Sequence, residues 1–139
     1  MAESPEGDTI KIFDLDLQKR VHCDWYTNVP MLRHAVIEGM GVAHENLEHE
    51  KLMEMIERFC VNMKFSIVDR LHYQFTPYGK SIVFVLEESH VAVHSWPERG
   101  YIHMDIVTCT PQESSSSQLV AEFNAVFSPE NTRLLKLKY

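Results

Sequence analysis

The fold of this chain is decided by the stretch KSIVFVLEESHVAVHSWPERGYIHMDIVTC, residues 80–109. An apolar run over 82–86 stops at the polar sequence Glu87-Glu88-Ser89-His90. Extended runs over 90–95 and 101–109 follow, with the turn Pro97-Glu98-Arg99-Gly100 between them. Short apolar or alternating runs bounded by turn residues are typical of strands. Because strands joined by tight turns run antiparallel, we expect hydroxyl, imidazole, carboxylate and thiol groups at the strand ends of this stretch.

Helices are predicted on both sides of this stretch. Apolar residues recur at three- and four-residue intervals from Leu47 to Met63 and again over 118–127, the spacing of amphipathic helices. Cys60 lies on the apolar stripe of the first of these helices, so we expect it in the core. A shorter helix is predicted from Pro30 to Glu38, because proline suits a first helical turn and the glycines at 39 and 41 would end it.

The remaining segments are predicted to be strands. Period-two alternation over 65–75 places one set of side chains on a core face: Phe65, Ile67, Leu71, Tyr73 and Phe75. Extended chain is also expected over 9–26, where Val21, Cys23 and Trp25 alternate with polar or aromatic neighbours, and over 132–139. Helices that interrupt a set of antiparallel strands predict an α+β fold, a two-layer sandwich with an antiparallel sheet and helices on one face.

Length and composition limit the class of protein. The 139 residues fit one domain spanning 1–139, with residues 1–8 as a short disordered arm. The net charge of −7, without a cluster of Lys and Arg, argues against nucleic acid as a partner. The longest apolar run is 82–86, too short to cross a membrane, and the polar, acidic N-terminus does not have the pattern of a signal peptide.

The cysteines indicate a compartment. Cys23, Cys60 and Cys109 are odd in number and widely spaced, which argues against a disulfide framework and for a reducing environment. We therefore expect a cytoplasmic protein. No spacing of Cys and His supports a metal site, and His72 and His103 alternate with apolar neighbours, as surface or internally bonded histidines often do.

Ser89 has the neighbours of a reactive serine, Glu88 and His90, but the same residues also suit a polar turn. The nucleophile elbow of a hydrolase needs glycines two residues before and after the serine. Those positions are Glu87 and Val91 here, so the local sequence does not favour a protease-type triad.

A longer pattern is more specific. It comprises Pro77-Tyr78-Gly79, Ser81, Glu88-Ser89-His90, His94-Ser95-Trp96-Pro97-Glu98 and Asp105-x-x-Thr108-Cys109. From about Phe75 to Cys109 the chain resembles the pyruvoyl-dependent S-adenosylmethionine decarboxylases of the short prokaryotic type. Three features depart from the usual pattern of that family: an N-terminal extension through about Gly41, Thr110 after Cys109, and Lys80 before the serine at 81.

The resemblance implies that the chain cleaves itself between 88 and 89. The Ser89 hydroxyl would attack the carbonyl of Glu88, and the resulting ester would leave once the α-proton of residue 89 is removed. Hydrolysis would then leave a pyruvoyl group at position 89 and release ammonia. Ser81 would polarise the carbonyl under attack, and His94, with a near-neutral pKa, would accept the proton.

The same resemblance implies a substrate and a product. The pyruvoyl group would form a Schiff base with the amine of S-adenosylmethionine and take up the electrons released with carbon dioxide, while Cys109 donates a proton. Phe75 would stack on the adenine, and Glu98 would bind the ribose hydroxyls. The family also implies a homodimer of processed protomers, and a product that serves as aminopropyl donor in polyamine (spermidine) biosynthesis.

Two alternatives remain at this point. A relative of the same fold could decarboxylate ornithine or arginine, and an unprocessed homologue could be a regulatory subunit without activity. A geometric condition also applies, because Ser89 and His94 lie on opposite faces of a straight strand. They can meet only if the strand bends or bulges. We expect His90 to shape the site and Trp96 to serve in packing.

Overall fold

The computed structural model describes residues 8–14, 32–75, 77, 79–109 and 114–138. Its elements follow one another along the chain as β1 (Asp8–Asp14), β2 (Arg33–Met40), the 3-10 turn η3 (His44–Leu47), α1 (His49–Asn62), β3 (Ile67–Gln74), β4 (Lys80–Leu86), β5 (Ser89–Trp96), the 3-10 turn η4 (Pro97–Arg99), β6 (Tyr101–Thr108), α2 (Ser116–Phe127) and β7 (Asn131–Lys138).

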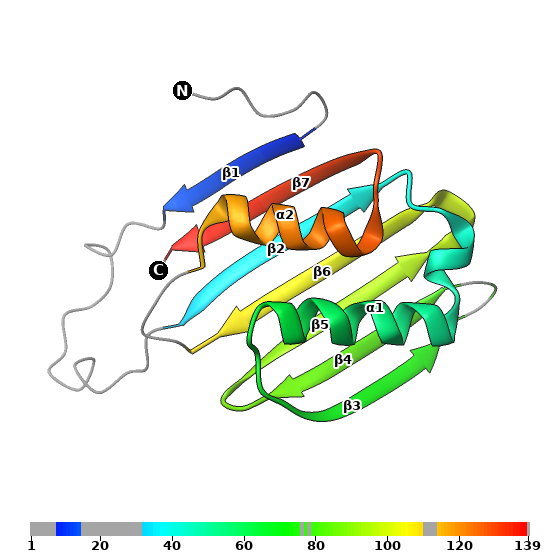
Figure 1. Cartoon of the computed structure of the whole chain (residues 1–139), viewed down its shortest axis with the longest axis horizontal. Coiled ribbons are helices and arrows are strands. Elements are labelled where there is room, and N and C mark those ends of the chain that lie inside the picture. The colour runs from blue at the N-terminus through cyan, green and yellow to red at the C-terminus, as the bar shows by residue number, and fades with distance from the viewer. Residues whose placement is uncertain (1–7, 15–31, 76, 78, 110–113, 139) are drawn as a thin grey trace, which may run out of the picture.

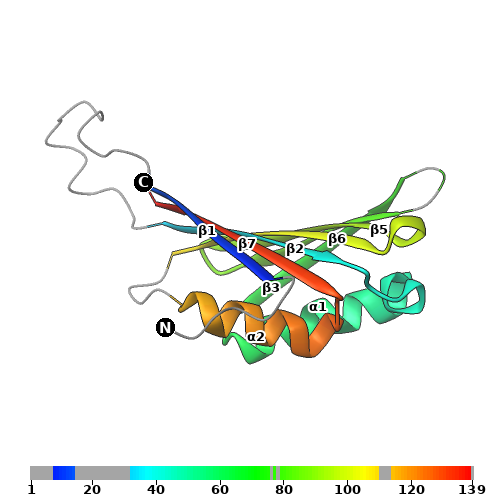
Figure 2. The ribbon, with the colours of Figure 1, turned by 90° about the horizontal axis from the view of Figure 1, so that it is seen from above.

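The strands form one sheet in the order β1-β7-β2-β6-β5-β4-β3. All neighbours run antiparallel except β1 and β7, which are parallel. Figure 1 shows α2 crossing β7 and β2, with α1 crossing β5 and β4, and Figure 2 shows both helices on the same side of the sheet. The predicted α+β two-layer sandwich is therefore confirmed, with a parallel edge strand added.

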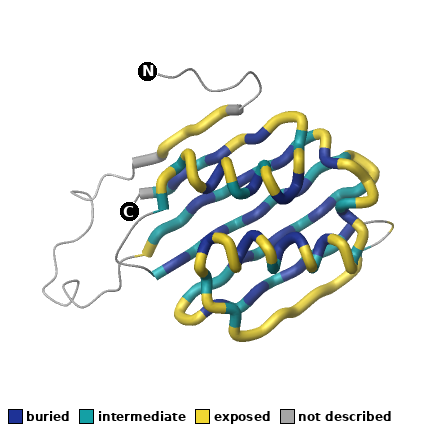
Figure 3. The backbone as a smooth tube through the Cα atoms, in the orientation of Figure 1, coloured by how far each residue is buried: buried dark blue, intermediate teal, exposed yellow. Residues whose placement is uncertain are grey.

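The core lies between the helices and the sheet. Strand residues alternate between buried and half-buried positions, and the buried ones face α1 and α2 (Figure 3). Both helices contribute the apolar stripes expected from their spacing, and Cys60 is fully buried, as predicted. The largest fully buried side chains are Phe59, Phe84, Phe123 and Phe127.

The predicted helix from Pro30 to Glu38 is wrong, because its described part belongs to strand β2. Ala35, Ile37 and Gly39 point toward the helices, and β2 pairs with β6 on one side and with β7 on the other. The position of Gly39 explains its residue type. A Cβ there would lie 2.9 Å from Ile102 Cγ2 and 3.0 Å from the ring of Phe123 in α2. This glycine permits close packing of α2 on the sheet and does not end a helix.

Strand β3 exists as predicted, but two residues of its expected core face, Leu71 and Tyr73, are exposed. The pairing register with β4 shifts between Ile67 and Asp69, which marks a β-bulge. An extra residue moves every later side chain to the other face of the sheet. Leu71 and Tyr73 therefore point away from the helices.

Some expectations fall on residues outside the described part of the chain. These are the strand through Val21, Cys23 and Trp25, and the disordered arm apart from Asp8, which begins β1. Within the described residues, none of the helices has the length and apolar character needed to span a membrane.

The burial pattern predicts unequal costs for two truncations in the β3–β4 hairpin. Phe84→Ala should lower the free energy of unfolding by about 3–5 kcal/mol, because the ring is fully buried beneath the helices. Leu71→Ala, at a position that is 58% exposed, should cost much less. Urea unfolding followed by circular dichroism measures both. Equal losses would contradict the assignment of Leu71 to the uncovered face.

Candidate active site

The face of the sheet away from the helices carries most of the candidate residues, and we call it the open face. Cross-strand pairing arranges its side chains in rows that run across the sheet. The His94 row consists of Tyr73, Ser81, His94, His103, Glu38 and Arg133. The His90 row, near the β4–β5 turn, consists of Asp69, Val85, His90, Val107, His34 and Leu137. A mostly apolar row lies between them and contains Asp105.

Ser81 and His94 form a hydrogen-bonded pair at one end of the open face. Ser81 Oγ lies 2.8 Å from His94 Nδ1 across the β4–β5 ladder. Burial, and then the neighbouring imidazole of His103, lowers the pKa of His94 below its ordinary value, while Asp105 acts in the opposite direction. His94 is therefore held in its neutral form near pH 7, in which an imidazole can accept a proton.

Aromatic rings lie next to this pair. The ring centroid of Trp96 is 5.6 Å from Phe75 and 5.3 Å from Tyr101. Gly79 makes room for Phe75, because a Cβ at this residue, which has φ +120°, would lie 2.3 Å from the Phe75 ring. An open pocket of about 500 Å³ is lined by Trp96 and Tyr101 together with Met40 and Arg99. Stacked aromatic residues beside a pocket suit a flat ring or a cation.

Charged side chains lie beside the aromatic group. The carboxylate of Glu38 is 2.5 Å from Arg133 Nη2. Burial, together with Glu38, raises the pKa of Tyr101 to about 12, so the phenol stays protonated at neutral pH. Glu98 is exposed in η4, directly after Trp96 and Pro97.

Ser89 and Cys109 lie at the other end of the sheet, where β5 begins and just after β6 ends. The register pairs Ser89 with the buried Leu86, so it places Ser89 on the helix side of the sheet. The two-residue turn from β4 to β5 holds Glu88 at φ +62°, a left-handed conformation that non-glycine residues rarely adopt. Ser89 follows as the first residue of β5, and its hydroxyl donates to the backbone oxygen of Glu87 at 3.3 Å. Ser89, Glu87 and Glu88 line one pocket of about 200 Å³ with Cys109, which is a half-buried free thiol.

Within one chain, Ser89 stays apart from the pair of Ser81 and His94. The β4–β5 register is continuous from the pair of Ser81 and His94 to the pair of Leu86 and Ser89, without the bulge that a contact between Ser89 and His94 would require. At about 3.3 Å per residue, these two pairs are separated by roughly 17 Å along the strands. A single chain therefore does not bring Ser89 to His94, because the condition for their meeting is not fulfilled.

The comparisons with known proteins agree with the motif. Residues 33–138 match the family model described as S-adenosylmethionine decarboxylase. The chain belongs to this family. A proenzyme of that name from Archaeoglobus fulgidus is 31% identical over 102 residues, which are 73% of this chain and 90% of the relative. One from Clostridium botulinum (strain Loch Maree / Type A3) is 35% identical over 78 residues, 55% of this chain and 67% of the relative.

Solved structures of S-adenosylmethionine decarboxylases share the fold. The enzyme from Aquifex aeolicus vf5 matches with a TM-score of 0.67 at 22% identity, over 77% of this chain and 88% of that one. The Trypanosoma brucei AdoMetDC-delta26 monomer matches with a TM-score of 0.52 at 16% identity, over 73% of this chain and 44% of that one. At these identities the likeness concerns the fold alone.

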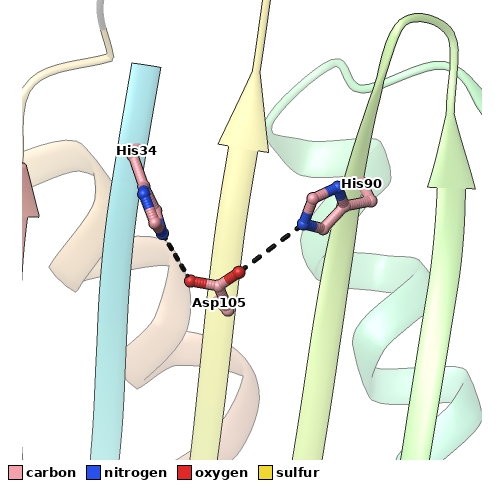
Figure 4. A network of polar contacts seen from close by, with 3 residues as sticks. All are labelled: His34, His90 and Asp105. Atoms are coloured by element: carbon pink, nitrogen blue, oxygen red, sulfur yellow. Dashed lines mark hydrogen bonds and ion pairs between the residues drawn. The ribbon is translucent and has the colours of Figure 1, made fainter. Parts of the chain in front are cut away.

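Against this family background, the structure adds one group that sequence reasoning missed. Asp105 lies between two histidines from neighbouring strands (Figure 4). Its Oδ1 is 2.6 Å from His34 Nε2, and its Oδ2 is 3.5 Å from His90 Nε2. The sequence does show an acidic residue inside the alternating strand 101–108, which is a signal of a functional side chain. Its partners His34 and His90 are 71 and 15 positions away in the sequence, so only the sheet register identifies them.

The neighbouring imidazole of His103 predicts a titration effect on His94. His103→Gln should raise the pKa of His94 toward its ordinary value of about 6.5, because it removes a group that disfavours the protonated form. NMR titration of the His94 ring measures this shift. His72→Gln is the control, since His72 packs against His49 and does not affect the pKa of His94. An unchanged His94 pKa in the His103 variant would contradict the coupling.

Proposed function

We propose that this protein is a self-processing, pyruvoyl-dependent decarboxylase that converts S-adenosylmethionine to decarboxylated S-adenosylmethionine for spermidine synthesis. The observation that carries the proposal is the placement of Ser89 directly after the left-handed Glu88 and in one pocket with Cys109. The names of its proenzyme relatives support the same reading. A cytoplasmic setting is part of the proposal, because Cys60 and Cys109 are free thiols.

The turn geometry favours self-cleavage. A left-handed conformation at a residue other than glycine costs on the order of 1 kcal/mol, and breaking the bond that follows Glu88 relieves it. The Ser89 hydroxyl attacks the Glu88 carbonyl, the nitrogen of residue 89 is displaced from that carbonyl, and an ester replaces the amide. Removal of the α-proton of residue 89 then expels the carboxylate of Glu88. Hydrolysis of the unsaturated residue 89 releases ammonia and leaves the ketone.

After cleavage, the roles of the side chains follow from their positions. When formed, the pyruvoyl group supplies a carbonyl that binds the substrate amine and accepts electrons as carbon dioxide leaves. Cys109 lies in the same pocket as residue 89, so its thiol is placed to donate a proton there. A thiol carries an S–H proton that it can transfer, which suits this role.

A second copy of the chain supplies the missing half of the site. We propose that two protomers stack open face on open face with their strands reversed, so that the His94 row of one lies over the β4–β5 turn of the other. Stacked sheets are separated by about 10 Å, a gap that side chains and a substrate can fill. Ser81 and His94 of one protomer then act on the Glu88–Ser89 bond of its partner. The half-buried, largely apolar row between the polar rows fits such an interface.

The same dimer places a binding surface opposite the pyruvoyl group. Phe75, Trp96 and Tyr101 offer aromatic faces to adenine and to the cationic sulfonium. Glu98 extends from η4 beside them, where its carboxylate can accept hydrogen bonds from two ribose hydroxyls. These residues favour a nucleoside substrate over ornithine or arginine, which have neither the base nor the ribose.

Mass spectrometry of the denatured protein tests processing. The wild-type chain should give two fragments that meet at Glu88 and Ser89, and Ser89→Ala should stay whole because it lacks the attacking hydroxyl. Release of labelled carbon dioxide should then occur with S-adenosylmethionine. Release from ornithine or arginine alone would identify the alternative decarboxylase, and a wild-type chain that never cleaves would support the regulatory alternative.

Subunit mixing tests the shared site. Ser89→Ala and His94→Ala chains, each alone, should remain whole. When they are co-expressed with different tags, the His94→Ala chain should be cleaved to the extent that mixed dimers form, because its Ser89 meets His94 of the partner. The Ser89→Ala chain should stay intact and serves as the internal control. If mixing leaves both chains whole while mixed dimers are isolated by their tags, the two halves of the site do not combine between protomers.

A further inference from the structure

The carboxylate of Asp105 joins three neighbouring strands on the open face, and no step of the proposed mechanism uses it. His34 comes from β2, Asp105 from β6 and His90 from β5 (Figure 4). The side chains of His34 and Asp105 are only 24% and 28% exposed, and their 2.6 Å contact is short. His90 lies farther out, at 3.5 Å and 45% exposed. The His34 contact thus fixes Asp105, and Asp105 in turn approaches His90.

Residue 89 has few anchors of its own. On one side Ser89 pairs with Leu86, while pairing of β5 with β6 begins one residue later, with His90 opposite Val107. As long as the chain is whole, the turn through Glu87 and Glu88 holds Ser89 in place. Cleavage removes that connection and makes residue 89 a chain end, and chain ends fray unless other contacts hold them.

His90 is the residue that remains to hold the new chain end. Its backbone is paired on both sides, with Val85 and Val107, and its side chain reaches Asp105. Asp105 lies in β6, and Cys109 follows directly after the last residue of that strand. Both are odd-numbered positions, which in β6 face the open side of the sheet. A contact from His90 to Asp105 therefore fixes residue 89 relative to the strand that leads into Cys109.

We propose that Asp105 is a positioning residue that, through His90, holds residue 89, the first residue of the C-terminal fragment after cleavage, against Cys109. This inference rests on the proposed function, since it concerns the enzyme after cleavage. In the intact chain the turn through Glu87 and Glu88 also holds Ser89, so the loss of Asp105 affects the processed protein more than the self-cleavage. The misplacement of a reacting group by about 1 Å can cost up to about 100-fold in rate.

The variant Asp105→Asn isolates this role with little change in shape. A carboxylate has two acceptor oxygens and can serve both imidazoles, whereas an amide has one. Asparagine can keep the shorter contact with His34 and lose the one with His90. We expect cleavage at 88/89 within about two-fold of wild type, kcat lower by about 10-fold to 100-fold, and KM nearly unchanged.

Asp69→Asn is the matched control. Asp69 lies in the His90 row, on the same open face, and its substitution removes the same charge. Among the described residues, its carboxylate accepts a hydrogen bond from the backbone nitrogen of its neighbour Arg70 and not from a histidine. Cleavage and kcat should be those of wild type. His90→Gln should lower kcat as Asp105→Asn does, and the double variant should be no worse than either single one, because both substitutions break the same contact.

Hydrogen exchange gives a readout that does not depend on turnover. In the cleaved proteins, the amides of residues 90–93 should exchange faster in Asp105→Asn than in wild type. In the uncleavable Ser89→Ala protein, the same amides should exchange at equal rates with and without Asp105→Asn. The fraction of C-terminal fragments that begin with alanine at position 89 after repeated turnover should also rise, since the α-carbon of residue 89 would receive the proton meant for the product.

The outcomes separate the two proposals. A wild-type chain that stays whole overturns both the proposed function and this inference. If the wild type cleaves and decarboxylates while Asp105→Asn matches it in kcat and exchange, only the positioning role is wrong. The role is also wrong if Asp105→Asn mainly abolishes cleavage, lowers the melting temperature or dissociates the dimer, because Asp105 would then serve folding or assembly.

Discussion

Between β4 and β5 the pairing register runs without a bulge from Lys80 opposite Ser95 to Leu86 opposite Ser89. This register fixes where the reactive groups lie. It brings Ser81 and His94 within hydrogen-bond distance at one end and places Ser89 directly after the turn at the other. Because this register is continuous, Ser81 and His94 do not reach the Glu88–Ser89 bond of the same chain. The proposed dimer takes its geometry from this constraint.

The sheet serves two purposes through its two faces. The helix-side residues are packed into one continuous core, which makes the strands stiff. The open face has half-buried residues and contains nearly all the titratable groups of the site. A stiff sheet keeps the rows of the open face in register over several strands, so that contacts such as those of Asp105 with His34 and His90 hold distant segments in fixed relation.

Much of the fold could be predicted from local patterns. The alternation over 80–109 and the spacing of α1 and α2 report burial directly, and the structure follows them. The wrong predictions concern segments whose structure is determined by contacts with residues distant in the sequence. Pro30 and Gly39 suggested helix boundaries, but pairing with β6 and β7 on both sides makes β2 a strand. In β3 the bulge after Ile67 reverses the faces, and no residue type in that segment signals it.

The candidate site was predictable in its members but not in its arrangement. Motif spacing identified Ser81, Ser89, His94 and Cys109, and their separation into two groups follows only from the strand register. Asp105 was part of the motif, yet its role depends on His34, which is 71 residues away.

Strand β1 has a consequence for how copies of this protein associate. It lies outside the family match at 33–138 and pairs only with β7, in parallel. Unpaired backbone groups at a sheet edge invite pairing with other chains. Strand β1 pairs with the backbone groups on the outer side of β7 within the same molecule. Strand β1 is thereby the edge strand of the sheet, so any continuation of the sheet into a neighbouring molecule on that side would run through β1 and not through β7.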